Sequence, residues 1–102
     1  MKVSEITTET LRNYLRLDDN TFDNELEIYL KSSINYVCEY TGLVQNDEKK
    51  ELDEHEDITT AILVLVSDFF ENHLYHQGGV GQEVKVNKVV DTILNQHRVN
   101  LV

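Results

Sequence analysis

A chain of 102 residues is long enough for one domain with a single modest core, and too short for two ordinary domains. Its 19 acidic and 9 basic side chains give a formal charge of −10, which disfavours binding to nucleic-acid phosphates or to an anionic membrane surface. One cysteine, no signal-like apolar N-terminus and a longest apolar run of only Ala61–Val66 predict a soluble protein of a reducing, cytoplasmic compartment.

The spacing of apolar residues predicts an all-α fold, a small bundle of about four helices, two long and two short. The first helix is short. Thr7 or Thr8 can cap it, because a threonine side-chain oxygen accepts a hydrogen bond from the free amides of a first turn. Leu11 and Leu15 lie four residues apart, so they share one face of this helix and are predicted to face the core.

The second predicted helix is long and spans Thr21–Thr41. Asn20 or Thr21 is the expected cap, and Gly42 stands where helices commonly end in a left-handed residue. Its tyrosines could stack on single-stranded bases, but the surrounding acidic charge favours packing in a core or an interface. These tyrosines are Tyr29, Tyr36 and Tyr40.

The third predicted helix, Asp57–His76, follows a strongly acidic segment. Residues 43–60 hold seven acidic and two basic side chains, and most of this stretch is predicted to be a solvated connection. Asp57 is the expected cap of the third helix. This helix is apolar around most of its circumference, which indicates either burial on several sides or contact with a partner chain.

The last third of the chain is predicted to change from helix to loop and back to helix. Gly78–Gly81 ends the third helix and opens a flexible arm. The alternation of Val84 and Val86 with charged residues such as Lys85 is compatible with a short exposed strand. Asn87 can then cap a short fourth helix.

No arrangement of residues in the sequence predicts catalysis or a bound cofactor. His73 and His76 have a spacing that can share a metal, but no third ligand is placed with them, so histidines near a helix end are the preferred interpretation. The acidic run 53–57 lacks the pattern of a calcium loop and is expected to be solvated. Cys38 is expected to be a small buried apolar residue rather than a nucleophile. We therefore expect a protein that is not an enzyme.

Four pieces of the sequence, taken in order, resemble the head–tail connector (adaptor) proteins of long-tailed bacteriophages and prophages. Val3–Asp18 is similar to the opening helix of that family, which ends in a "YLRID"-like phrase. Leu26–Gly42 resembles the long second helix with its final "YTG". Asp57–Asn72 resembles the third helix, which ends in an aromatic residue followed by Glu and Asn, and Val89–Arg98 resembles the closing helix.

This resemblance implies a structural protein of the virion, made in the bacterial cytoplasm and placed at the head–tail interface. Copies would form a ring of about a dozen subunits beneath the portal protein, meet a tail-completion (stopper) protein on the other side, and let DNA pass without specific binding. On this interpretation the contact residues are expected near the predicted arm and the tail. They are Phe69, Phe70, Leu74, Tyr75, Val84, Lys85, Val86 and Arg98.

Two other functions compete with the connector on the sequence alone. The acidic surface suits a regulatory or inhibitory module that mimics the charge of DNA and occupies a basic protein. A metal-dependent enzyme that uses His73 and His76 is the second competitor. Self-association into a ring would distinguish the connector from the acidic inhibitor. Tightly retained metal would support the metal-dependent enzyme.

Overall fold

The computed structural model describes the backbone of residues 1–75 and 88–98, and the side chains of 1–72 and 88–98. Within them the chain forms an all-α bundle, as predicted, with two long and two short helices. The elements in chain order are η1 (Val3–Glu5), α1 (Thr8–Leu15), α2 (Asp23–Thr41), η2 (Glu51–Glu54), α3 (Glu56–Tyr75) and α4 (Lys88–Gln96), where η marks a 3-10 helix. The predicted glycine arm, the strand around Val84–Val86 and the Asn87 cap lie outside the described residues.

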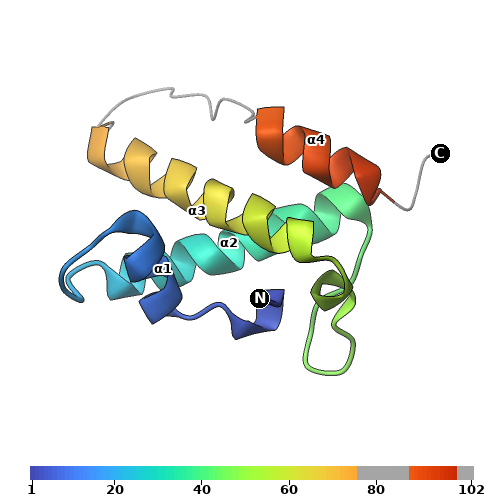
Figure 1. The fold of residues 1–102 in the computed structure, drawn as a ribbon, viewed down its shortest axis with the longest axis horizontal. Coiled ribbons are helices and arrows are strands. Elements are labelled where there is room, and N and C mark those ends of the chain that lie inside the picture. Colours follow the sequence, from blue (N-terminus) through green and yellow to red (C-terminus); the bar gives the residue numbers. More distant parts are fainter. Residues whose placement is uncertain (76–87, 99–102) are drawn as a thin grey trace.

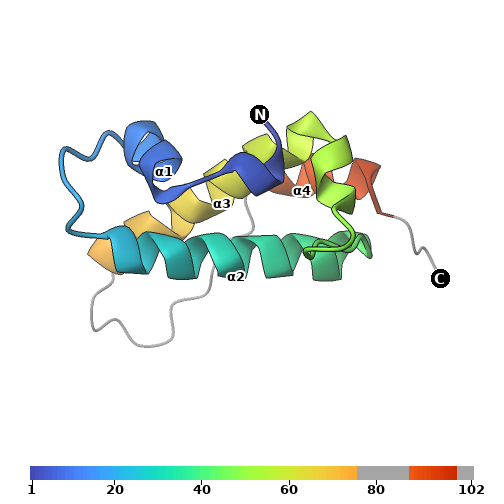
Figure 2. The same cartoon turned by 90° about the horizontal axis from the view of Figure 1, so that it is seen from below.

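The two long helices, α2 and α3, run antiparallel and form the body of the molecule (Figure 1). The short α4 lies along the first half of α3 and also contacts α2. Figure 2 shows α2 along one side of the molecule and α1 on the opposite side. Helix α3 contacts every other helical element, so it is the centre of the fold.

This central position explains why α3 is apolar around most of its circumference. Six of its apolar side chains are buried: Ile58, Ala61, Ile62, Leu65, Val66 and Phe70. Two more, Leu63 and Val64, are partly buried against the same core, and Phe69 is half-buried. Packing within the chain thus buries this helix on several sides, which is one of the two explanations that the sequence left open.

The starts of the first two helices differ in how well the sequence predicted them. Thr7 caps α1 as expected, since its Oγ1 accepts the N–H of Thr10 at 3.2 Å. Helix α2 begins at Asp23 rather than Thr21, and neither predicted residue caps it. The carboxylate of Asp19 accepts the N–H of Thr21 at 3.0 Å, which forms a separate turn before the helix.

The predicted end of α2 is confirmed. Gly42 has φ 82°, in the left-handed region that glycine enters without a steric penalty. Its N–H donates to the carbonyl of Cys38 at 2.9 Å and closes the last turn. Cys38 itself is only partly buried, whereas the sequence predicted a buried residue, and this burial raises the pKa of its thiol.

The connection between α2 and α3 is more ordered than the prediction of a solvated segment. Gln45 and Lys50 pair in an isolated β-bridge, and η2 places Leu52 fully in the core. Asp57 was predicted to cap α3, which is wrong: the helix already begins at Glu56, and the Asp57 side chain binds His97 instead. Leu52 is a single leucine between charged residues and carries no periodic signal, so only the folded chain shows that it is buried.

Asp53 joins this connection to the N-terminal segment. Its carboxylate accepts hydrogen bonds from the N–H and the hydroxyl of Ser4, and from Nε2 of Gln45 at 3.0 Å. Partial burial raises the pKa of Asp53, but the hydrogen bonds from Ser4 and Gln45 outweigh it and leave the pKa below its ordinary value of 3.8. The charged form of Asp53 is therefore the form that the fold stabilises.

We expect Asp53→Ala to lower the free energy of unfolding by at most about 1 kcal/mol at neutral pH, because the carboxylate remains largely solvated. A group with a lowered pKa in the folded state stabilises above its unfolded pKa and loses that effect as the pH falls. The difference between the two proteins should therefore shrink below pH 3.8, in urea titrations followed by circular dichroism. Asp47→Ala removes the same charge from the same connection and is the control. If the difference in free energy of unfolding between wild type and Asp53→Ala stays the same at acidic pH, the fold does not stabilise the charged form of Asp53.

Ser33 is a buried polar residue of α2, and its hydroxyl has no hydrogen-bond partner among the described residues. A buried hydroxyl without a partner destabilises the folded state, and alanine favours the helix more than serine. We expect Ser33→Ala to raise the free energy of unfolding by about 1 kcal/mol. The exposed neighbour Ser32 provides the control, since Ser32→Ala changes helix propensity alone. Equal effects of both substitutions would show that burial of the hydroxyl contributes nothing.

Candidate functional site

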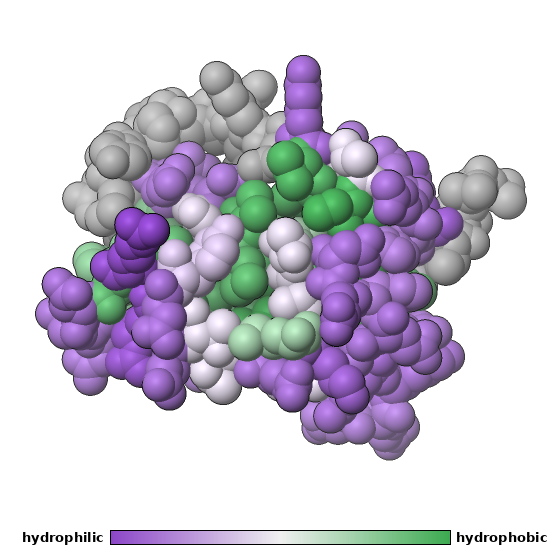
Figure 3. Space-filling view, in the orientation of Figure 1, coloured by the Kyte–Doolittle hydropathy of each residue, from purple (hydrophilic) through white to green (hydrophobic). Residues whose placement is uncertain are grey.

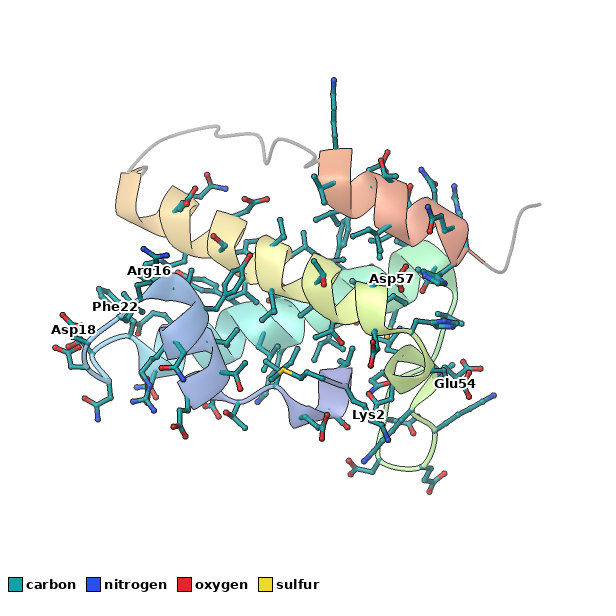
Figure 4. The ribbon with its side chains drawn as sticks, viewed as in Figure 1. Lys2, Arg16, Asp18, Phe22, Glu54 and Asp57 are labelled. Atoms are coloured by element: carbon teal, nitrogen blue, oxygen red, sulfur yellow. The ribbon has the colours of Figure 1, made fainter. Side chains whose placement is uncertain are left out.

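Two of the predicted contact residues lie at the C-terminal end of α3, packed against α2. The ring of Phe70 meets the ring of Phe22 edge to face, with centroids 5.1 Å apart, and only 5% of Phe70 is exposed. The ring of Phe69 stacks on Tyr29 with centroids 5.9 Å apart. In Figure 4, Phe22 lies in the connection between α1 and α2, at the end of the molecule where α3 ends. Phe70 is therefore used inside its own chain and leaves little surface for a neighbour.

The remaining predicted contact residues are not brought together with these phenylalanines. The side chains of Leu74 and Tyr75, and the whole of Val84, Lys85 and Val86, lie outside the described residues. Arg98 is at the opposite end of α3, because the preceding His97 contacts Asp57 in the first turn of that helix. The Arg98 guanidinium lies 5.1 Å from the centre of the Tyr40 ring, a cation–π contact within the chain.

The largest apolar exposure on the face seen in Figure 3 lies where α3 and α4 run side by side. On α4 the buried pair is Val90 and Leu94, so the helical register turns Val89 and Ile93 toward one flank. Val89 is 56% exposed and Ile93 is partly buried. The apolar surface of α3 beside α4 continues this flank in Figure 3. We call the surface that Val89 and Ile93 form beside α3 the α3–α4 strip.

Sequence reasoning did not single out this strip. Val89, Val90, Ile93 and Leu94 all read as the apolar face of one short helix. These four positions span an arc that is ordinary for the apolar face of a surface helix, so the sequence carried no signal that one of them would stay exposed. In the structure Val90 and Leu94 enter the core, whereas Val89 is 56% exposed.

The other flank of α4 is bound to α2 through Tyr40. The hydroxyl of Tyr40 lies 2.7 Å from Oδ1 of Asp91 and 2.8 Å from the amide group of Asn95. Both atoms beside the hydroxyl are oxygens, Oδ1 of Asp91 and Oδ1 of Asn95, so the single phenolic hydrogen can be donated to either acceptor. Tyr36 stacks on the same ring with centroids 6.1 Å apart.

A second polar contact joins the end of α4 to the beginning of α3. Nε2 of His97 lies 2.8 Å and 2.9 Å from the two carboxylate oxygens of Asp57. The His55 ring lies beside the His97 ring, with centroids 4.2 Å apart. In Figure 4, Asp57 is at the first turn of α3, next to the last turn of α4. The Asp57 carboxylate thus orients the His97 imidazole, and the His55 imidazole lies against it.

Tyr40 should make the docking of α4 sensitive to alkaline pH. The hydrogen bond to Asp91, with burial and the negative charge of Asp91, raises the pKa of Tyr40 above its ordinary value of 10.0. A group with a raised pKa stabilises the fold below its unfolded pKa, and that effect is lost as the pH rises through the folded pKa. We expect absorbance at 295 nm to show a late ionisation of Tyr40, accompanied by loss of helical circular dichroism.

Tyr40→Phe should remove this late step, and Asp91→Asn should move it to lower pH. Burial also raises the pKa of Tyr29, so the difference between wild type and Tyr40→Phe is the measurement that isolates Tyr40. A titration curve unchanged by Asp91→Asn would contradict the hydrogen bond as the cause.

Two histidines have a spacing that can share a metal, His73 and His76. The side chain of His73 and all of His76 lie outside the described residues. Among residues 1–72 and 88–98, no three histidine, cysteine, aspartate or glutamate side chains converge as metal ligands.

Within the described part of the chain, no helix has the length and apolar character to cross a membrane.

Comparisons of the chain with protein-family models, with curated proteins and with solved structures find no match.

Proposed function

We propose that this chain is a subunit of the head–tail connector of a long-tailed bacteriophage or prophage. The resemblance of four sequence pieces is the starting point, and the order and lengths of the four α-helices agree with it. In this role the protein assembles with copies of itself beneath the portal protein. It extends the channel through which DNA passes and meets a tail-completion protein on the other side.

The α3–α4 strip is the observation on which this proposal depends. A surface valine that is 56% exposed, one helical turn from the partly buried Ile93, can become part of an interface at little structural cost. A second apolar residue, Ile28, is 60% exposed on the outer face of α2, on the side of that helix away from the buried Leu26 and Val37. Two different faces that meet between neighbours give the head-to-tail contacts of a closed ring.

The negative charge also supports this role. With a formal charge of −10, the subunit repels the phosphates of a passing duplex. A lysine-rich channel would instead bind those phosphates with release of counterions and would slow the passage of DNA. The acidic composition therefore suits a wall along which DNA slides.

The test is co-expression with the portal protein of the same phage or prophage, followed by light scattering and negative-stain electron microscopy. We expect portal-bound rings of many copies of this chain, with an open centre. A chain that stays monomeric in the presence of the portal would overturn the proposal. A one-to-one, salt-sensitive complex with a basic nucleic-acid-binding protein would instead support the acidic inhibitor.

A further inference from the structure

Helix α4 depends on its neighbours for its structure. It has nine residues, from Lys88 to Gln96, and an isolated helix of this length is not stable in water. Two of its side chains, Val90 and Leu94, are fully or almost fully buried. Its helical state is therefore linked to its docking on α2 and α3.

Two polar contacts supplement the apolar contact of Val90 and Leu94. Both involve residues from Asp91 onward. The first is Tyr40 of α2 with Asp91 and Asn95, at 2.7 Å and 2.8 Å. The second is Asp57 of α3 with His97, at 2.8 Å. We call them the tyrosine clasp and the histidine clasp. They approach α4 from two different helices, so together they fix its position.

The rest of the core does not depend on α4. Fourteen buried apolar side chains form the core of the described residues, and twelve of them come from residues 3–70. These twelve belong to η1, α1, α2, η2, α3 and the turn between η1 and α1. Those elements contact one another directly, with α3 at the centre. Loss of α4 docking would therefore leave most of the core packed.

From this distribution we propose that α4 undocks and redocks as a unit on a body of residues 1–75 that stays folded, and that the two clasps set how often it does so. Local opening of this kind occurs where a segment buries few apolar side chains and the body beneath remains intact. The open state exposes the part of the core that Val90 and Leu94 cover. The inference does not depend on the proposed function.

Native-state hydrogen exchange of the full chain, followed residue by residue by NMR, tests the proposal. We expect the amides of α4, such as that of Leu94, to exchange at least about tenfold faster than the slowest amides of α2 and α3, for example those of Val37 and Ile62. Equal rates would mean that α4 opens only when the whole protein unfolds, and would overturn the proposal.

Single-residue variants then test the clasps. Tyr40→Phe should accelerate exchange in α4 by about tenfold, as expected for loss of a hydrogen bond to a carboxylate, and leave the amides of α3 unchanged. Tyr36→Phe makes the same chemical change one turn earlier on α2 and should leave α4 unchanged. His97→Gln tests the other clasp and serves in place of Tyr40→Phe if that variant does not fold. Equal acceleration of α3 and α4 by these variants would contradict a separate unit.

Discussion

Replacing Ile62 by alanine should lower the free energy of unfolding by about 2–5 kcal/mol. Ile62 lies in the middle of α3, the helix that contacts all the others, and its side chain is fully buried. The substitution removes buried apolar surface and leaves a cavity that the surrounding helices can close only in part. Since small domains are stable by about 5–15 kcal/mol in total, a large part of the native stability would be lost. Urea unfolding followed by circular dichroism at 222 nm measures the change.

Ile28→Ala is the matched control for this experiment. It makes the same chemical change in the other long helix, at a side chain that is 60% exposed. Exposed substitutions usually change the stability by less than about 0.5 kcal/mol, and alanine favours the helix more than isoleucine. Similar losses at the two positions would mean that Ile62 is not at the centre of the core.

The helices were predictable because their apolar residues recur at helical spacing and their ends carry local signals. Gly42 ended α2 as expected, and Thr7 capped α1. The start of α2 was misplaced because Asp19 forms its own turn with Thr21, a competition between caps that spacing cannot decide. Val3 and Leu52 are buried from short 3-10 helices. Isolated apolar residues in polar segments show no period, so only tertiary packing determines their burial.

The polar contacts around α4 could not be predicted, because their partners are far apart in the sequence. Tyr40 and Asp91 are separated by 51 positions, and Asp57 and His97 by 40. Each residue alone had a simpler local interpretation, such as a helix cap for Asp57 or packing in a core or an interface for Tyr40. Composition and spacing describe one segment at a time, whereas these contacts arise from the packing of α2, α3 and α4 around one another.

Phe70 was predicted as a contact residue, and in the single chain its side chain is already buried. An apolar helix can use its surface within its own chain or with another, and the sequence does not distinguish the two uses. Phe70 packs on Phe22 inside the bundle. On α4, by contrast, Val89 is exposed, as follows from the register that Val90 and Leu94 impose.

If copies of the chain meet through the α3–α4 strip, Val89→Asp should abolish the portal-bound ring. Burial of an unpaired carboxylate in an interface costs several kcal/mol, which weakens each contact by at least about a hundredfold. The isolated subunit should fold normally, because Val89 is 56% exposed and is the second residue of α4, where a negative charge is favourable. Circular dichroism checks the fold, and light scattering with the portal protein checks assembly.

Val44→Asp adds the same charge at another valine, 40% exposed in the connection after α2, and should still assemble. A ring that forms with Val89→Asp would place the contact between copies elsewhere on the surface and remove the strip from the interface. If wild type itself fails to assemble with the portal, the connector role is wrong, whatever the variants do. The two failures are thus distinguishable, because the first concerns the surface used and the second the function of the chain.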